Sequence, residues 1–550
     1  MLALASLAAA AWAQPASRVT PRDLRPEPPP SSSAPALPES APQQAPAAAS
    51  LQVTVAGIEV VGGYPEFVTA TKQLAAPFAQ RRVTVGELYK LAESLENLYR
   101  SEGYLLVRAV IPPQQLNDGG VFRINILDGF IESVDAGALP ERVRDSVKDL
   151  LAPLVGQARL RNNAVERALT LAGRAPGVTL RSTLAPGTRA GGSVLVLEGE
   201  HALVAGSYAA DSRLSEALGP WQGTIQLRAN QPLGHGEQAY VYVSGDPNPG
   251  RMLRSEARRR VAGGGVIVPI GPDGLAFNAE YTWSDTKNPG SFYVPPTQSG
   301  FERASLRLSY PLLLTRDSEV TLTGSFDASS QWTQVPLFDL TLNQDRLRVF
   351  RLGVDAGGAV GEIGRWRASG LFSHGVSRFG ARGWDDVYES GVPFSRPGAE
   401  PRFSKLEASA SWEQLLKYGL SWRANVRGQH AAGGALPSAE LFSLDGEDAL
   451  SSFPSGTLSD DSGWTARTEL ARQFTLSLGD APWPLAPYVF YAGGKPHSEL
   501  GVHAGYSTSY GAGVRSNWKA LSLSLEWGRG TLRPGGYAET QLFAKGQVVF

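Results

Sequence analysis

The sequence predicts a transmembrane antiparallel β-barrel that follows two small α+β modules. Three observations carry this prediction. Strands of period two fill the C-terminal part of the chain, two β-α units precede them, and the chain ends in phenylalanine on an apolar face. The composition agrees, because 61 glycines, 12 tryptophans and 17 tyrosines suit many turns and interfacial aromatic side chains. No later run of about 18 apolar residues occurs, so no transmembrane helix is expected.

The N-terminal segment 1–13 is interpreted as an export signal peptide. It is apolar and uncharged, and Ala11-Trp12-Ala13 has the small-x-small pattern of a cleavage site. Residues 14–50 are rich in proline, alanine, serine and glutamine. They are expected to form a disordered linker, because such a segment has too little apolar surface to build a core.

The first module is expected at residues 51–130. A helix is predicted from Gly86 to Ser101, because leucines recur there at spacings of three and four and form one apolar stripe. Strands are expected on both sides of it, at 53–60, 105–111 and 121–127, with the turn-rich sequence Asn117-Asp118-Gly119-Gly120 before the last one.

The second module, at residues 131–200, repeats this plan. A strand at 131–134 is followed by two predicted helices at 142–151 and 162–171, and strands are expected at 178–184 and 193–197. Two modules of this size fit the lower end of the range of domain lengths.

From residue 201 to 550 the apolar period changes to two. In one example, Phe277, Ala279 and Tyr281 alternate with Asn278 and Glu280. Comparable segments of about ten residues recur to the end of the chain, which is typical of transmembrane barrel strands. A soluble sandwich also has strands of period two. The many charges on the polar face and the absence of a helical break favour the barrel, whose lumen would hold those charges.

The C-terminal strand ends at Phe550. Counting back by twos gives Val548, Gly546, Ala544 and Leu542, all non-polar, so Phe550 lies on the apolar face. A terminal strand that ends in this way is similar to the signal that outer-membrane barrels present to their assembly machinery.

Other functional classes find no support in the composition. The chain has no cysteine and a net charge of -1, so disulfides, cysteine metal sites and a nucleic-acid footprint are not expected. The six histidines show no metal-ligand spacing, and no glycine-rich run ends in the lysine of a phosphate loop. We therefore expect no enzymatic activity, no metal and no cofactor.

Several short motifs, taken in order, resemble the transporters of two-partner secretion. The first module resembles their first POTRA module at Tyr99, Gly103, Tyr104, Pro112, Gln114, Asp118 and Gly119. The second resembles their second POTRA module at Glu166, Arg167, Pro176 and Gly177. Segment 436–444 and the sequence Asp461-Ser462-Gly463 resemble the flanks of the lid loop, which is expected near 440–462.

This resemblance implies a barrel of about 16 strands in the outer membrane of a Gram-negative bacterium, with the POTRA modules in the periplasm. It implies that an unfolded partner exoprotein, of β-helical type, binds the modules and passes through the barrel without ATP. Outer-membrane lipid and the barrel-assembly machinery are the other expected partners, and the barrel is expected to be monomeric. The family also has an N-terminal plug helix. Prolines between Gln14 and Glu27 disfavour a helix here, so a short plug, a coil in the pore and no plug all stay open.

Two motifs depart from the family pattern. At the lid tip, Leu450-Ser451-Ser452-Phe453 has serine at the position of the family's arginine. On the barrel wall, Phe490-Tyr491-Ala492-Gly493 has tyrosine in place of the acid that approaches that arginine. Replacing both members of a buried ion pair can be nearly neutral, whereas losing one costs about 3–5 kcal/mol. We therefore expect a lid that is held differently.

Two alternatives to secretion of a β-helical protein remain at this point. The altered motifs also fit an export barrel for a different cargo, such as a peptide or a non-β-helical protein. A passive, porin-like barrel is the third reading, and it would conduct steadily without any dependent cargo.

Overall fold

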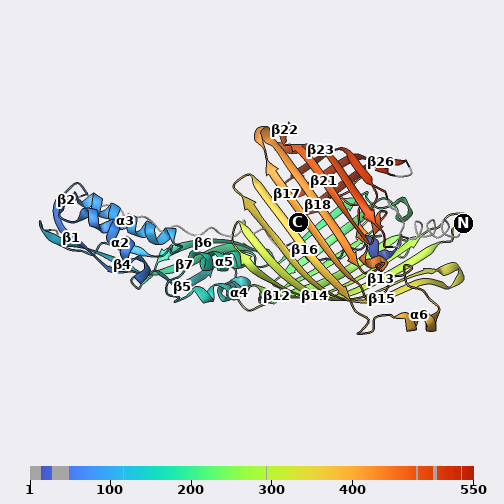
Figure 1. Cartoon of the computed structure of the whole chain (residues 1–550), viewed down its shortest axis with the longest axis horizontal. Coiled ribbons are helices and arrows are strands. Elements are labelled where there is room, and N and C mark those ends of the chain that lie inside the picture. The colour runs from blue at the N-terminus through green and yellow to red at the C-terminus, as the bar shows by residue number, and fades with distance from the viewer. Residues whose placement is uncertain are drawn as a thin grey trace.

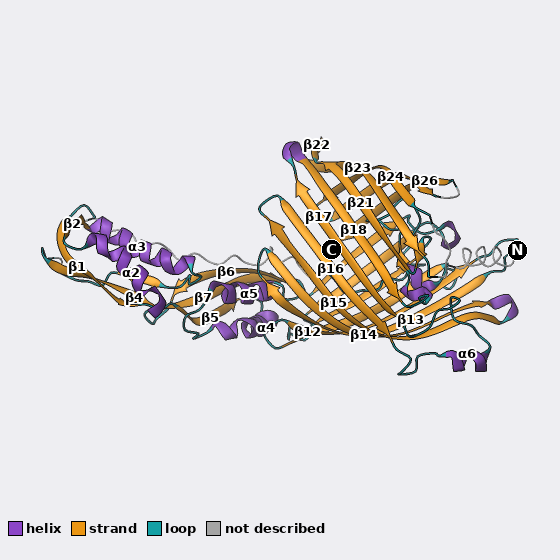
Figure 2. Ribbon diagram, viewed as in Figure 1, coloured by secondary structure: helices purple, strands orange, loops and turns teal. Residues whose placement is uncertain are grey.

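The computed structural model describes residues 14–27, 49–115, 117–292, 294–478, 481–499, 505–533 and 536–550. The predicted signal peptide and most of the predicted linker, at 1–13 and 28–48, lie outside the described residues. An elongated arm of two modules joins one end of a closed β-barrel (Figure 1). Most of the helices lie in the arm, and strands form the barrel wall (Figure 2).

The first module is a four-stranded sheet, in the order β2-β1-β4-β3, covered by helices. Helix α3 begins after Thr84, which forms a capping box with Glu87 and so satisfies free backbone N–H groups at the helix start. The predicted leucine stripe lies inward at Leu88, Leu91 and Leu95. The elements are β1 (Gln52–Gly62), α2 (Val68–Ala75), β2 (Arg81–Thr84), α3 (Val85–Ser101), β3 (Arg108–Val110) and β4 (Gly120–Leu127).

The second module has a three-stranded sheet in the order β5-β7-β6, with two helices packed on it. Its core contains Val143, Val147 and Leu151 from one helix and Leu169 from the other. The elements are β5 (Phe130–Ala138), α4 (Glu141–Leu151), α5 (Asn162–Gly173), β6 (Val178–Pro186) and β7 (Gly192–His201).

The barrel is closed by antiparallel pairing all the way round. Strands β21 and β22 both pair with β23 and are separated only by Gln473, so they act as one wall strand and the barrel has 16 strands. The first eight are β8 (Val204–Asp211), β9 (Gln222–Asn230), β10 (Gln238–Gly245), β11 (Arg259–Ile270), β12 (Leu275–Asn288), β13 (Thr297–Leu314), β14 (Ser318–Val335) and β15 (Leu340–Val360). The others are β16 (Gly364–Gly375), β17 (Ser404–Leu415), β18 (Leu420–Ala432), β21 (Ser462–Arg472), β22 (Phe474–Leu478), β23 (Ala481–His497), β24 (Ser507–Trp518), β25 (Leu521–Leu532) and β26 (Tyr537–Val549).

The wall strands bury their polar face and expose their apolar face. On β12 the side chain of Tyr281 is 50% exposed, whereas its neighbour Glu280 is 4% exposed. On β17, Leu406 is exposed and Lys405 is buried in the same way. A soluble sandwich has the opposite arrangement, with its apolar face in the core. The alternation therefore identifies a lipid-facing barrel with a polar lumen and excludes the sandwich.

None of the helices in the described part of the chain is long and apolar enough to span a bilayer. Outside the arm, α6 (Trp384–Ser390) lies in the loop between β16 and β17. Short 3-10 turns occur at Ala16–Val19, Glu216–Leu218 and Ser438–Glu440. Two strands of two residues each, β19 (Phe442–Ser443) and β20 (Ser459–Asp460), pair antiparallel with each other.

Phe550 takes part in closing the barrel. Its N–H donates to the carbonyl of Gly206, and the Gly206 N–H donates to the carbonyl of Phe550, at 2.9 and 2.8 Å. This pair continues the contact between the last strand, β26, and the first, β8. The Phe550 side chain is exposed on the apolar face. Its role as an assembly signal stays a prediction.

Candidate functional site: a pore closed by a plug and a lid

Residues 14–27 lie inside the barrel as a coil with a single 3-10 turn, Ala16–Val19 (Figure 1). Of the options that the sequence left open, the structure thus shows a coil in the pore. Thr20 follows the turn, and its hydroxyl donates to the Ala16 carbonyl at 2.6 Å and forms a hydrogen bond with Ser284 Oγ on β12 at 2.7 Å. The Ala16 N–H donates to Ser299 Oγ on β13 at 3.2 Å. We call residues 14–27 the plug.

Arginines of the wall hold the plug by its backbone carbonyls. Arg259 donates to the carbonyl of Val19, Arg303 to that of Pro21 at 3.0 Å, and Arg307 to that of Arg22 at 3.4 Å. A helix would use its own carbonyls internally, whereas a coil leaves them free for these donors. The prolines that prevent a helix are therefore compatible with this mode of binding.

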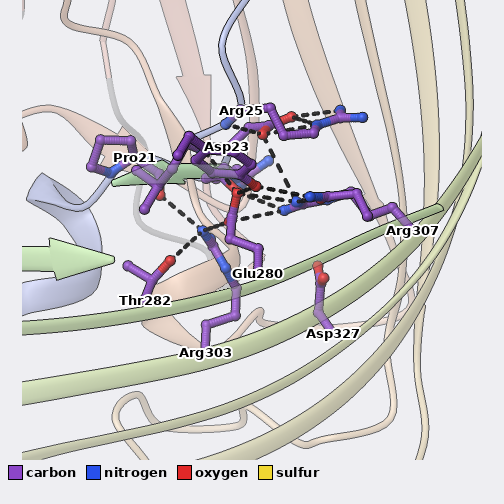
Figure 3. Close-up of polar contacts among 12 residues, drawn as sticks. Pro21, Asp23, Arg25, Glu280, Thr282, Arg303, Arg307 and Asp327 are labelled. Atoms are coloured by element: carbon purple, nitrogen blue, oxygen red, sulfur yellow. Dashed lines mark hydrogen bonds and ion pairs between the residues drawn. The ribbon is translucent and has the colours of Figure 1, made fainter. Parts of the chain in front are cut away.

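Glu280 pairs with two of the wall arginines, Arg303 and Arg307 (Figure 3). Its buried carboxylate lies 3.3 Å from Arg303 and 3.2 Å from Arg307, and it accepts the Leu24 N–H of the plug at 3.1 Å. Buried arginines without such a partner would be strongly destabilising. The wall thus presents several charged donors, two of them paired with Glu280, and one acceptor to the plug backbone.

The lid is the segment 433–461 between β18 and β21, and buried charges hold it in the lumen. Glu440 lies 2.6 Å from Arg351 of β15 and 2.9 Å from Lys405 of β17. Asp445 accepts the N–H groups of Gly456, Thr457 and Leu458 at 3.1, 2.8 and 2.7 Å, which closes the loop on itself.

The lid flank predicted at Asp461-Ser462-Gly463 anchors the end of this loop. Asp461 pairs with Arg396 and accepts the Leu436 N–H at 2.7 Å. Ser462 Oγ accepts the Ala431 N–H at 2.8 Å. Gly463 has a φ of +152°, and a Cβ there would lie 2.8 Å from the carbonyl oxygen of Lys495.

The plug and the lid are linked through the wall. Arg22 of the plug pairs with Glu407 at 2.5 Å, and Lys405 lies 2.8 Å from the same carboxylate. Lys405 also pairs with Glu440 of the lid. One buried lysine therefore shares its charge between a carboxylate that holds the plug and a carboxylate that holds the lid.

The lid tip, Leu450-Ser451-Ser452-Phe453, lies in a groove of small wall residues. Gly528 and Gly530 of β25 leave room for it, since a Cβ there would lie 2.4 Å from Ser452 Oγ and 2.6 Å from the Phe453 ring. Leu450 and Phe453 share an apolar cluster with Ala492 of β23. The Ser452 N–H donates to Ser509 Oγ at 3.0 Å.

The cation that is absent from the lid tip is present on the wall. Arg467 of β21 donates to Ser451 Oγ, pairs with Glu526 of β25 at 2.8 Å and lies 3.9 Å from the centre of the Phe490 ring. Arg467 was not among the site residues predicted from the sequence. The alternation of Thr465, Arg467 and Glu469 on the polar face of this strand was the available signal.

The prediction that Tyr491 faces the lid tip is wrong. Tyr491 is 51% exposed, on the outer face of β23, whereas Phe490 and Ala492 are buried on the lumen side. Gly493 also lies on the outer side, where a Cβ would meet the hydroxyl of Tyr506. Because successive strand residues face opposite sides, an assignment shifted by one residue changes the face. The side chain that meets the lid here is Ala492.

We call the POTRA-like motif residues of the two modules the framework residues. In the first module, three of them, Tyr99, Gly103 and Tyr104, lie near the joint with the second module. Tyr99 Oη accepts the Tyr64 N–H at 3.1 Å, and the Tyr104 ring packs edge-on against Tyr64. The Gly103 carbonyl accepts the Asn162 N–H of the second module at 2.8 Å. Burial and the hydrogen bond to Asp128 raise the pKa of Tyr64, so this phenol stays a neutral donor at the joint.

The other framework residues of this module fix the β3–β4 connection, in which Pro112 lies. Gln114 bonds both the N–H and the carbonyl of Arg123 at 2.9 Å. Asp118 accepts the Thr54 N–H at 2.7 Å, and Gly119 turns the chain at a φ of +80°.

The framework residues of the second module lie near its junction with the barrel. Glu166 accepts the Arg316 N–H at 2.7 Å, and Arg167 donates to the Pro311 carbonyl at 2.7 Å. The Pro176 carbonyl accepts from Gln231 at 3.0 Å. Gly177 has a φ of +74°, and a Cβ there would lie 2.4 Å from the Ala202 carbonyl. These contacts fix the arm to turns at one end of the barrel.

Comparison with known proteins agrees with this architecture. The family model described as haemolysin secretion/activation protein ShlB/FhaC/HecB matches residues 191–516. The model described as POTRA domain, ShlB-type, matches residues 53–129.

Two curated relatives and one solved structure are similar along most of the chain. The outer membrane transporter CdiB of Escherichia coli is 25% identical over 429 residues, covering 76% of this chain and 68% of the relative. The hemolysin transporter protein ShlB of Serratia marcescens is 23% identical over 457 residues, covering 78% and 75%. The structure of CdiB from Escherichia coli has a TM-score of 0.70 at 21% identity and covers 93% of both chains.

The family model alone spans more than half of the chain. The barrel places this chain in the outer membrane with its POTRA modules in the periplasm. The chain belongs to the haemolysin secretion/activation family ShlB/FhaC/HecB, and it is an outer-membrane transporter of the two-partner secretion type.

Proposed function

We propose that this transporter binds its partner exoprotein unfolded at the POTRA modules and threads it through the lumen, without ATP, after the plug and lid have moved. The observation that carries this proposal is the closed pore itself. Two segments of the chain fill it, and polar and apolar contacts hold them there. Contacts of this kind can be exchanged for contacts with another chain.

The modules offer surfaces suited to an extended chain. In the first sheet, β2 pairs only with β1 and β3 only with β4, so both outer edges can accept a strand. In the second, β5 and β6 are the edge strands. Apolar side chains at Val61, Val68 and Val121 are exposed on the first module and can contact alternate apolar residues of a guest.

The lumen can accommodate an unfolded chain of varied sequence. Arg259, Arg303 and Arg307 hold carbonyl oxygens of the plug, and every extended peptide presents such oxygens. A passing segment can therefore replace the plug without matching its side chains. Folding of the exoprotein outside the cell would supply the direction, so no nucleotide is needed.

A reducible disulfide between the plug and the wall tests whether the plug must leave the lumen during secretion. Because the chain has no cysteine, Thr20→Cys with Ser284→Cys gives one defined pair at hydroxyls that lie 2.7 Å apart. Proteins in the culture medium are compared by mass spectrometry with those of a strain lacking the transporter. The double variant is expected to stop secretion until a reductant is added, while either single variant secretes normally.

Unchanged secretion with the disulfide formed would contradict threading through the lumen. Removal of residues 51–200 tests the modules separately, and it is expected to leave an inserted, heat-modifiable barrel that no longer secretes the partner. Secretion that survives this deletion would contradict recognition by the modules.

The remaining partners also belong to this proposal. Outer-membrane lipid surrounds the apolar face, and the barrel-assembly machinery inserts the chain by reading the strand that ends at Phe550. The same mass-spectrometric comparison tells a β-helical cargo from a peptide, because a large β-helical protein would be missing from the medium of the strain that lacks the transporter. A passive channel would instead conduct steadily, and no exported protein would depend on it.

A further inference from the structure

The seam between the first and last strands of the barrel is only partly paired. Strand β8 pairs with β26 over five residues, from Ser207–Val549 to Asp211–Lys545. On its other side, β26 pairs with β25 along its length, from Leu521–Val548 to Leu532–Tyr537. Beyond the short seam, Ser212 still contacts Ala544 through both its N–H and its hydroxyl, at 3.0 and 2.9 Å.

The next part of β26 leaves its edge unpaired. Phe550 and Ala544 direct their backbone groups to the β8 side, so every second residue between and beyond them does the same. The residues in this series after Ala544 are Leu542, Thr540 and Ala538. Their N–H and carbonyl groups on that side have no hydrogen-bond partner in the described parts of the chain.

The edge is open because the loop after β8 folds into the lumen instead of continuing along β26. Leu214 and Leu218 in this loop are buried against Val19 of the plug. Arg213 donates to the carbonyl of Ser451 at the lid tip, at 3.1 Å. The plug and the lid thus hold the loop in a position that leaves room for another strand.

A cavity of 610 Å³ lies beside this edge, next to the β8–β9 loop at the extracellular end of the barrel. Apolar side chains from the loop, the lid and β26 line it, while Glu216 and Glu539 add negative charge. The main apolar contributors are Leu214, Trp221, Phe453, Leu458 and Phe543. Its volume is within the range of about 300–1,000 Å³ that is common for binding pockets.

We propose that this slot binds an extended segment of the exported protein by strand addition to β26, with alternate apolar side chains in the cavity. The proposal rests on the proposed function and names a docking site for the cargo on the extracellular side. An unpaired strand edge is a template for another chain. Here the backbone groups at Leu542, Thr540 and Ala538 supply the hydrogen bonds, and the cavity selects apolar side chains on one face of the guest.

The two glutamates add a charge preference. Glu216 and Glu539 disfavour acidic residues on the guest face that enters the cavity. The site therefore fits a strand with alternate valine-, leucine- or isoleucine-like residues and without carboxylates between them. A segment held in this way can act as the first paired strand of the exoprotein as it emerges.

Peptide binding to the purified full-length transporter in lipid nanodiscs tests the site directly. The probe is a fluorescent eight-residue peptide of alternating valine and threonine, read by anisotropy. Thr540→Pro removes the N–H that points into the slot, whereas Thr540→Ala keeps it and serves as the matched control. The N–H of residue 540 faces away from β25, so the proline spares that ladder.

Thr540→Pro is expected to weaken peptide binding about tenfold relative to Thr540→Ala, because one backbone hydrogen bond is lost and the ring obstructs the edge. Replacing the valines with aspartates should abolish binding. Equal affinity of the two variants, both with a heat-modifiable barrel, would overturn the proposal, as would equal binding of the aspartate peptide.

Cross-linking of stalled cargo gives a second, independent measurement. The cargo is the protein whose export depends on the transporter, halted by a fused folded domain and carrying single cysteines. Thr540→Cys is compared with Thr531→Cys, an outward-facing position on β25 whose strand is paired on both sides. Disulfide adducts are expected at residue 540 and not at 531.

The two proposals fail in different ways. If the wild-type protein secretes its partner but neither the peptide nor the stalled cargo uses the slot, the slot proposal is wrong and the secretion proposal stands. If no protein depends on the transporter for export, the secretion proposal is wrong, whatever the peptide result.

Discussion

The plug and the lid close the same pore by different chemistry. The wall holds the plug mainly through backbone carbonyls, as with Pro21 and Arg303. It holds the lid through specific side chains, above all Glu440 and the tip residue Ser451. Backbone contacts can be made by any extended chain, whereas side-chain contacts depend on sequence. Cargo can therefore take the place of the plug, whereas the lid must be moved aside.

The largest effect is expected when a side chain that holds the lid is removed. Glu440→Ala leaves Arg351 and Lys405 buried without one of their shared acids, which should weaken lid closure by about 3–5 kcal/mol. The open probability of single channels in a planar bilayer measures this change. Glu447→Ala is the control, because its pair with Lys545 is partly exposed and should contribute no more than about 1 kcal/mol. Equal effects would remove the special role of Glu440.

The next largest effect is expected when a donor to the plug backbone is removed. Arg303→Met removes the donor to the Pro21 carbonyl but leaves Glu280 paired with Arg307. Plug binding should weaken by about 1.5–3 kcal/mol, as expected for a hydrogen bond from a charged group. Protease accessibility of the plug and channel conductance both report its release. A plug as protected as in the wild type would contradict the assignment of Arg303.

A third prediction moves the arginine from the wall to the lid tip. Ser451→Arg restores an arginine at the tip but places it against Arg467, so lid closure should weaken by about 1–3 kcal/mol from crowding and repulsion. Adding Arg467→Ser should recover much of the loss, since one cation then faces Glu526. Channel recordings of the single and double variants decide this. No recovery in the double variant would show that the two positions do not exchange roles.

The smallest effect is expected at a side chain of the plug. Thr20→Val removes the hydroxyl bonds to Ser284 of the wall and to the Ala16 carbonyl within the plug, but it leaves the bonds from the wall arginines to the plug carbonyls, so the cost should be about 0.5–1.5 kcal/mol. The plug should stay in place at rest, as judged by low conductance. A loss as large as that of Arg303→Met would show that plug side chains matter as much as its backbone.

The sequence predicts those parts of the fold that repeat along the chain. Alternation on β12 and β17 predicts the barrel because lipid and lumen impose opposite polarity on successive residues. The stripe at Leu88, Leu91 and Leu95 predicts α3 because a helix needs one apolar face. The lid and its flank were expected from motif resemblance alone.

What the sequence did not predict depends on contacts without a local pattern. The plug has no periodicity, since its carbonyls rather than its side chains are bound. Arg467 is one of several lumen arginines, and only the folded barrel shows which one meets Ser451. Tyr491 was assigned to the wrong face because a shift of one residue along a strand reverses its direction.

Because Lys405 contacts both Glu407 and Glu440, release of the plug and release of the lid are thermodynamically coupled. When Arg22 leaves with the plug, Glu407 loses one of its two cations and competes more strongly with Glu440 for Lys405. Plug release then lowers the free energy needed to release the lid, and by reciprocity a displaced lid lowers the affinity of the plug. Because the plug and the lid stabilise each other when both are in place, spontaneous release of either is rare, yet an arriving chain that displaces one of them eases release of the other.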